Sequence, residues 1–95
     1  MVKILISNFV SGADGVAQGA MVAAALSAAL ASHDTVSLSF KGIGSASSSF
    51  VSAALIPSLR SLGFDNFKRR VRISDASWQV SDVVKRRVAL ELEAA

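Results

Sequence analysis

The residues best suited to chemistry are clustered in a glycine- and serine-rich segment near the middle of the chain. The segment KGIGSASSS holds four serines after two glycines: Ser45, Ser47, Ser48 and Ser49, after Gly42 and Gly44. A serine hydroxyl at the start of a helix accepts a hydrogen bond from the free backbone N–H groups there. At least one of these serines is therefore expected to cap a helix. A phosphoserine in the same place adds about −1.5 to −2 charges where the helix dipole tolerates them. The segment is thus also suited to a phosphorylation switch.

Other residues that could support catalysis or nucleotide binding have unsuitable spacing. Gly12, Gly15 and Gly19 follow the pattern G-x-x-G-x-x-x-G without a lysine, which matches neither a dinucleotide fingerprint nor a P-loop. They are better explained as turn and packing glycines. The single histidine, His33, falls at the expected end of a helix, and no G-x-S-x-G elbow accompanies the serines. The chain has no cysteine and no acid pair spaced for a metal. We expect no enzyme activity, no catalytic residue, no metal and no cofactor.

Basic residues are concentrated late in the chain. Seven of the ten form this group: Lys68, Arg69, Arg70, Arg72, Lys85, Arg86 and Arg87. Because they fall on a strand and a helix adjacent in sequence, we expect one positive region. Such a region could bind nucleic-acid phosphates or an acidic protein surface. The plainer interpretation is the solvated faces of an edge strand and an outer helix. Only Phe67 and Trp78 interleave with these charges, which argues against nucleic acid.

Hydrophobic periodicity predicts the elements that position these residues. Strands are expected over residues 2–7, 35–40 and 67–74, and helices over 16–31, 49–62 and 78–94. Asp14 is placed to cap the first helix, Pro57 to kink or shorten the second, and Gly63 to end it. Alternating strands and helices imply parallel pairing with right-handed crossovers. The predicted fold class is therefore α/β, in the order β-α-β-α-β-α, with a small three- to four-stranded, mainly parallel sheet.

Apolar spacing also predicts which sides of these elements are buried. In the last strand, Phe67, Arg69, Val71 and Ile73 are expected to share one face. The buried stripe of the second helix is expected to hold five residues: Val51, Ala54, Leu55, Leu59 and Leu62. That of the last helix is also expected to hold five: Val80, Val83, Val84, Val88 and Leu92.

Length and composition indicate one small domain over residues 1–95. The chain is 52% hydrophobic and 18% charged with a net charge of +3, which argues against disorder. The alanine-rich run 15–31 is interrupted by Gln18 and Ser27, so we expect a buried helix and no membrane partner. With no export signal recognised, a soluble cytoplasmic protein is expected. A thin core and the free edges of a small sheet also favour a homodimer.

Two stretches resemble a known family. VSLSFKGIGSASSSFVSAAL, at 36–55, resembles the signature of the STAS domain, shared by sulphate transporters and anti-sigma factor antagonists: a strand, a loop ending near Asp-Ser-Ser-Gly, then a helix. It is more similar to the STAS-like family, whose loop commonly ends Ser-Ser-Ser-Phe. LGFDNFKRRVRI, at 62–73, also resembles that family. The first half of the chain is similar only in layout.

The resemblance implies roles for individual residues. Ser48 and Ser49 fall on the two serines of the STAS motif, and Ser48 on the one that a switch kinase phosphorylates in anti-sigma factor antagonists. Ser47 stands where those proteins have aspartate, and Phe50 where they have glycine. With Gly44, these residues form the candidate phosphoacceptor and partner-binding site.

We therefore expect a non-enzymatic regulatory domain that binds a partner protein through residues 42–50. The resemblance implies bacterial signalling and a kinase-like ATPase of the anti-sigma type as that partner. One alternative is an inhibitor-like protein whose basic region binds nucleic acid or an acidic partner. Another is an enzyme or small-ligand binder that uses the glycine loop at residues 12–15.

Overall fold

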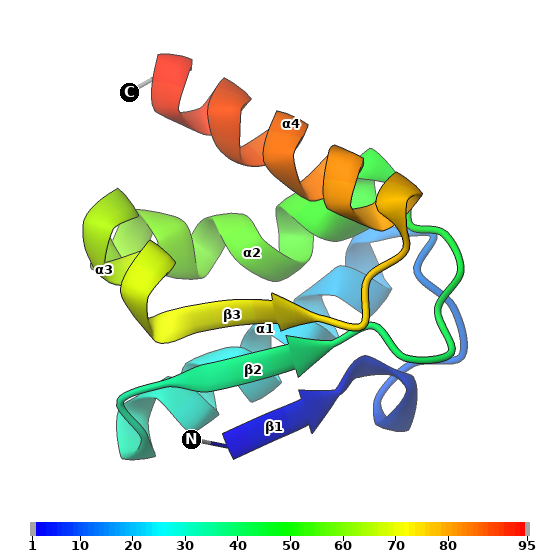
Figure 1. Ribbon diagram of the computed structural model, residues 1–95, viewed down its shortest axis with the longest axis horizontal. Helices are drawn as coiled ribbons and strands as arrows, with labels where there is room; N and C mark the ends of the chain where they lie inside the picture. Colours follow the sequence, from blue (N-terminus) through cyan, green and yellow to red (C-terminus); the bar gives the residue numbers. More distant parts are fainter. Residues whose placement is uncertain (1, 95) are drawn as a thin grey trace.

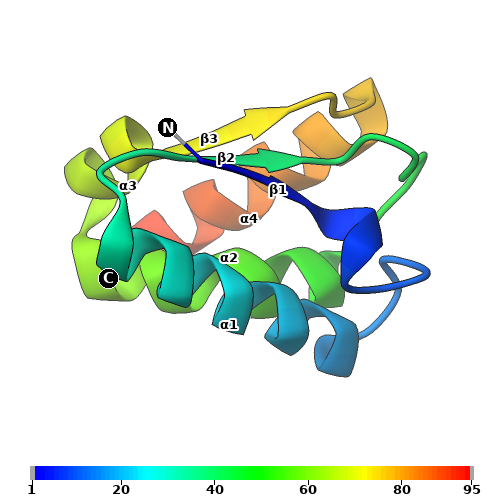
Figure 2. The same cartoon turned by 90° about the horizontal axis from the view of Figure 1, so that it is seen from below.

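A computed structural model describes residues 2–94 and shows a small parallel sheet with its helices gathered on one face (Figure 1, Figure 2). The strands are β1 (Val2–Leu5), β2 (Val36–Ser39) and β3 (Val71–Ser74), in the spatial order β1-β2-β3. The helices are α1 (Val16–Ser32), α2 (Ser48–Leu62), α3 (Phe64–Arg70) and α4 (Trp78–Ala94). A 3-10 turn, η1 (Ile6–Asn8), follows β1 and shortens the strand expected to reach Ser7. The predicted α/β class and parallel pairing are confirmed, with three strands.

The strand order explains why the structure has two layers. Each strand lies beside the one before it, so right-handed crossovers place α1 and α2 on the same face. The register pairs Val36 with Val2 and with Val71, and this row faces the helices. The core between the layers includes Leu38, Phe40 and Leu55, all at most 1% exposed. The adjacent row, Lys3, Ser37 and Arg72, lies on the opposite face of the sheet.

Residues 64–70 form helix α3, and the prediction of a strand beginning at Phe67 is wrong. Gly63 ends α2 with φ +80°, a conformation that glycine adopts without steric cost, and α3 starts at the next residue. Asp65 lies in the first turn of α3, and Lys68, Arg69 and Arg70 lie in its last turn. A negative charge near the first turn and positive charges in the last turn interact favourably with the helix dipole, which stabilises a short helix here. The alternating pattern that predicted a strand corresponds to an actual strand only from Val71 onward.

Helices α1 and α2 approach each other closely at Gly19. A Cβ on Gly19 would lie 2.5 Å from the carbonyl oxygen of Phe50 and 2.7 Å from the Cβ of Ala53. The expected packing role of this glycine is confirmed. The expected capping role of Asp14 is wrong, because the N-cap is Gly15. The side chain of Gln18 instead accepts hydrogen bonds from the N–H groups of Asp14 and Gly15.

Helix α2 continues through Pro57 from Ser48 to Leu62, so the proline does not shorten it. Pro57 is exposed, and the buried side of the helix is formed by its neighbours Ile56 and Ser58. The expected buried stripe is confirmed except at Leu62, which is only half-buried. Gly63 donates its N–H to the Leu59 carbonyl, as expected for the residue that ends the helix.

Helix α4 packs mainly against α2 at the outer side of the helical layer. Val80 and Val83 are buried, whereas Val84 and Val88 are half-buried. Leu92, expected in the same buried stripe, is 42% exposed. Of the helices within residues 2–94, none has the length and apolar character needed to cross a membrane.

Candidate functional site

The segment between β2 and α2 is held by hydrogen bonds to the loop that precedes α1. Ser47 is the N-cap of α2, and its hydroxyl accepts a hydrogen bond from the Phe50 N–H at 3.1 Å. The same hydroxyl donates to the Asp14 carbonyl at 2.6 Å, and the Ser47 N–H donates to the Ala13 carbonyl at 2.9 Å. The predicted capping serine is therefore Ser47, and its hydroxyl is fully engaged.

The start of α4 holds the same segment from its other side. Gln79 bonds both backbone groups of Ala46: its Oε1 accepts from the Ala46 N–H at 3.1 Å and its Nε2 donates to the Ala46 carbonyl at 3.2 Å. Ser77 donates its hydroxyl to the Gly44 carbonyl at 2.9 Å. The same Ser77 oxygen accepts from the Val80 N–H, as an N-cap does. The segment is thereby fixed between the loop before α1 and the start of α4. The backbone directly before Ser48 and Ser49 is therefore held in place.

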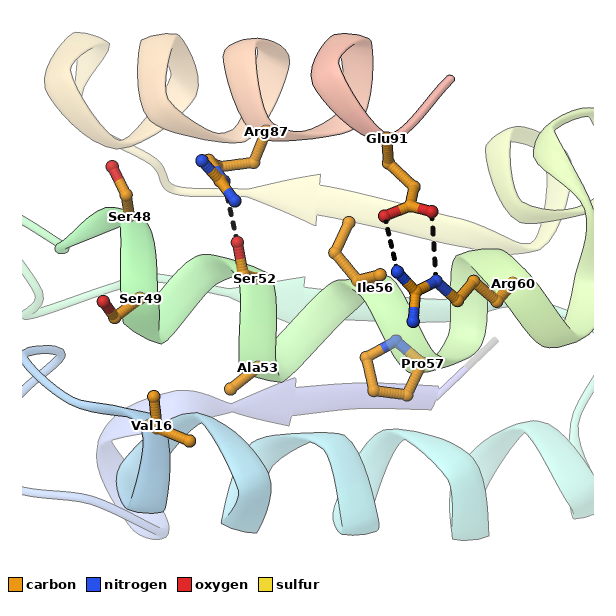
Figure 3. Close-up of a pocket in the computed structure, with 10 residues that line it drawn as sticks. All are labelled: Val16, Ser48, Ser49, Ser52, Ala53, Ile56, Pro57, Arg60, Arg87 and Glu91. Carbon is orange, nitrogen blue, oxygen red and sulfur yellow. Dashed lines mark hydrogen bonds and ion pairs between the residues drawn. The ribbon is translucent and has the colours of Figure 1, made fainter. Parts of the chain in front are cut away.

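Ser48 and Ser49 begin α2 and are exposed at one end of a groove of about 600 Å³ (Figure 3). Neither hydroxyl makes a hydrogen bond with any residue in 2–94. Ser48 and Ser52 turn toward α4 in Figure 3, whereas Ser49 and Ala53 turn toward α1. The groove runs along the outer side of α2, and its wall on the α1 side includes Val16.

Two contacts between α2 and α4 cross this groove. Near the serines, Arg87 Nε donates to the Ser52 hydroxyl at 2.7 Å. Farther along, Arg60 makes a two-pronged contact with Glu91, with both N···O distances 3.0 Å. The hydrogen bond from Arg60 lowers the pKa of Glu91, and the same bond raises the pKa of Arg60. Arg87 forms no salt bridge within the described residues, although its charge also helps to lower the pKa of Glu91.

The other predicted members of this site have separate environments. Gly44 is exposed in the anchored segment, beside its bond from Ser77. Phe50 is completely buried, and its ring belongs to the hydrophobic core. The structure therefore brings Gly44, Ser48 and Ser49 to the surface, while the side chain of Phe50 faces inward.

The seven basic residues do not form the single positive region that was expected. Arg70 donates to the carbonyls of Leu30, His33 and Asp34 and so holds the C-terminal end of α1. Arg72 lies on the sheet face opposite the helices. On α4, Arg87 faces the groove, and Arg86 pairs with Asp82.

The other three residues of the predicted basic region, two on α3 and one on α4, also have separate surroundings. Arg69 donates to Asn66, and Lys68 lies over the ring of Phe64, its Nζ 6.0 Å from the ring centre. Lys85 lies on α4 close to Phe64, where both line a second, apolar hollow. The reason for the dispersal is that Arg69 and Arg70 lie on a helix, whereas Arg72 lies on a strand.

A polar cluster joins the carboxyl ends of β2 and β3 to the side chain of Lys3 on β1. The Ser39 hydroxyl donates to Asp75 Oδ2 at 2.5 Å, and Lys3 Nζ lies 3.4 Å from the same oxygen. The hydrogen bond from Ser39 and the neighbouring Lys3 lower the pKa of Asp75. Asp75 has φ +55°, a left-handed conformation that aspartate tolerates better than most residues. Because Ser39 is completely buried, this cluster joins strands instead of presenting a nucleophile.

Several residues of the groove, and Gln79 that holds the segment before it, were missed by sequence reasoning. Arg87 was assigned to a general basic region, and Ser52, Arg60, Gln79 and Glu91 were not singled out. The i,i+4 spacing of Ser48 with Ser52, and of Arg87 with Glu91, places each pair on one helix face. Only the packing of α2 on α4 shows that the two faces meet.

Comparisons with models of protein families, with curated proteins and with solved structures find no match. Within residues 2–94, no group of three acidic or histidine side chains could hold a metal ion. What the groove offers chemically is an exposed pair of serine hydroxyls, an arginine outside any salt bridge in the described residues, and apolar lining side chains such as Ile56 and Pro57. These features suit recognition of another molecule and attachment of a phosphate.

Proposed function

We propose that this protein is a non-enzymatic regulatory domain that binds a partner protein through residues 42–50 and the adjoining groove along α2. Ser48 is its phosphoacceptor and acts as the switch. The observation that carries the proposal is the difference between neighbouring serines: Ser47 is committed to structure, whereas the Ser48 hydroxyl is exposed and unbonded within the described residues. The resemblance to anti-sigma factor antagonists supports a kinase-like ATPase as the partner.

The geometry supports a switch that leaves the fold intact. Ser48 is the first residue of α2, where added negative charge is favoured by the helix dipole. Ser52 lies one turn farther along the same face and already holds Arg87. A phosphate on Ser48 is therefore near the guanidinium of Arg87, which forms no salt bridge within residues 2–94. The modification changes the charge and shape of the groove end while the anchoring bonds of Ser47 remain.

Affinity capture with mass spectrometry tests the proposal by identifying both the bound proteins and the phosphorylated serines. The bait is the wild-type protein, compared with Ser48→Ala and Ser48→Asp. We expect Ser48→Ala to retain the partner and Ser48→Asp to reduce its affinity by about tenfold, because charge at an interface strongly affects association. Circular dichroism of both variants should match the wild type.

Ser61→Asp is the matched control, since Ser61 is an exposed serine in the last turn of the same helix. It should bind the partner as the wild type does. Equal partner binding by wild type, Ser48→Ala and Ser48→Asp would contradict the switch. Equal loss in Ser48→Asp and Ser61→Asp would show that charge anywhere on α2 weakens binding, which also contradicts a specific role for Ser48.

A further inference from the structure

An apolar hollow of about 350 Å³ lies between α3 and the C-terminal half of α4, away from the groove that holds Ser48. Its lining is apolar apart from Lys85: Phe64, Val84, Val88, Ala89 and Leu92 complete it. Phe64 is 38% exposed and Leu92 is 42% exposed. Large apolar side chains that meet in a concave surface mark a place where another molecule docks.

The arrangement of the layers explains why this surface is uncovered. In a parallel α/β sheet, a helix that follows a strand packs over that strand and the next one. Helix α4 follows β3, which is the edge of the sheet in residues 2–94. The buried part of its inner side includes Val80 and Val83. Val84 and Val88 are half-buried and pack partly against the core, and their remaining surface lines the hollow together with Leu92.

Two positively charged lysine side chains beside the hollow favour an occupant that carries negative charge. Lys85 is part of the lining, and Lys68 lies over the ring of Phe64. Neither lysine forms a salt bridge within the described residues. Glu91 on α4 is held by Arg60 on the side facing α2. The other acidic residues close in sequence to the lining are Asp65, Asp82 and Glu93; none of them lines the hollow, and Asp82 pairs with Arg86. An apolar hollow with free ammonium groups is complementary to an apolar segment that carries carboxylates.

We propose that this hollow binds an acidic amphipathic helix of a partner protein. One or two apolar side chains of that helix enter between Phe64 and Leu92, and its flanking carboxylates pair with Lys68 and Lys85. A second copy of this chain is a poorer occupant, because it would bring the same two lysines toward each other. This surface is separate from the groove at Ser48, so the inference does not depend on the proposed switch.

A pair of synthetic peptides provides the test. One is a helical peptide with leucines at every third or fourth position and glutamates on both flanks, and the other has lysines in place of the glutamates. NMR titration with the acidic peptide should shift the amide signals of Phe64 and of residues 84–92. The lysine peptide should cause no comparable shifts. Absence of binding by the acidic peptide, or equal binding by both, would overturn the proposal.

Charge-reversing variants locate the contact. Lys68→Glu combined with Lys85→Glu should weaken the acidic peptide roughly tenfold, since exposed ion pairs contribute modest energies that reversal turns into repulsion. Arg86→Glu is the matched control, because Arg86 neighbours Lys85 on α4 but does not line the hollow. It should bind within about twofold of the wild type. Equal weakening by Arg86→Glu would show nonspecific attraction and reject the site.

Leu92→Ser tests the apolar part, since this exposed leucine can be replaced without opening the core. It should weaken the acidic peptide while leaving the unfolding midpoint nearly unchanged. Two further measurements would favour other occupants and overturn the proposal. One is dimerisation in sedimentation that Leu92→Ser abolishes. The other is a shift of the same amides by vesicles containing anionic lipid, with no response to the acidic peptide.

Discussion

At the scale of single residues, Gly19 sets the distance between the two central helices. The carbonyl oxygen of Phe50 lies where a Cβ would be placed, and a backbone atom cannot move aside without shifting α2. Gly19→Ala should lower the free energy of unfolding by about 1–3 kcal/mol through overpacking. Alanine also raises the helix propensity by about 1 kcal/mol relative to glycine. A net loss of stability therefore requires the close contact between α1 and α2 at Gly19.

Urea unfolding measures this change, and Gly44→Ala is the control. No atom lies within 4 Å of a Cβ built on Gly44, so its substitution should change stability by less than about 0.5 kcal/mol. If Gly19→Ala were as stable as the wild type, the two helices would be farther apart than the structure has them.

Asp75 makes stability depend on pH in a direction that its contacts define. The hydrogen bond from Ser39 and the charge of Lys3 lower its pKa in the folded protein. A lowered folded-state pKa means that the carboxylate contributes stability above the ordinary aspartate range. That contribution is lost as pH falls through the folded pKa. Acidification should therefore weaken the link between β3 and its neighbouring strands.

Asp75→Asn isolates this contribution, because asparagine also tolerates the left-handed backbone at this position. The wild type should be the more stable protein near neutral pH, and the difference should shrink as the solution is acidified. Chemical unfolding at several pH values between about 7 and about 2 measures it. A difference that stays constant with pH would show that the carboxylate charge does not contribute.

At the scale of elements, Gln79 joins the start of α4 to the segment before α2. Its amide satisfies both backbone groups of Ala46, and no other side chain in residues 2–94 bonds that residue. Gln79→Ala removes both bonds and should cost about 2 kcal/mol of unfolding free energy, since each is worth about 1 kcal/mol. Amide signals of residues 44–49 should broaden, because the support of the serines is weakened.

Gln79→Glu is the informative comparison for that prediction. It keeps an acceptor for the Ala46 N–H but replaces the donor to the Ala46 carbonyl with a second acceptor. It should also be less stable than the wild type, because two acceptors then face each other at the Ala46 carbonyl. Unchanged signals for residues 44–49 in both variants would show that the segment is held by the Ser47 bonds alone.

The elements also show which features could be predicted from sequence. Strands β1 and β2 and helices α1, α2 and α4 follow from apolar periodicity and from Gly63. Helix α3 could not be recognised, because FKRRVRIS alternates like a strand while its first four residues are helical. The serine cluster was found from its glycines, but the pairing of Gln79 with Ala46 joins residues 33 positions apart. Such contacts depend on how α4 packs, which local patterns do not determine.

At the scale of the whole molecule, all helices cover one face of the sheet, and its other face is polar apart from Leu5. Ser37 and Ser74 bond each other there at 3.0 Å, and Lys3 and Arg72 are exposed. The hydrophobic content therefore serves a single layer between the sheet and the helices. The basic side chains behind the net charge of +3 lie mainly on α3, α4 and the polar sheet face. Most of them therefore contact their own neighbours and do not form one positive surface. Arg70 is the clearest case, because it serves the end of α1.

This architecture predicts that α4 opens independently of the rest. Helices α1 and α2 share the core with the sheet, whereas α4 meets mainly α2 and leaves Leu90 and Leu92 exposed. Segments with few buried apolar contacts exchange their amide hydrogens through local opening at lower free energy than global unfolding. Amides in the last two turns of α4 should therefore exchange faster than those near Leu26 in α1 and Leu55 in α2.

The ion pair between Arg60 and Glu91 provides a specific test of this independent opening of α4. Among the described ion pairs, it is the one that holds the C-terminal half of α4 against α2. Arg60→Gln should accelerate exchange of residues 88–93 and leave the slowest amides of α1 unchanged. Lys85→Gln removes a charge from α4 without touching this pair and should have no such effect. Native-state hydrogen exchange followed by NMR separates the outcomes. If the amides of α4 and α1 exchanged with the same free energy, the whole domain would open as one cooperative unit.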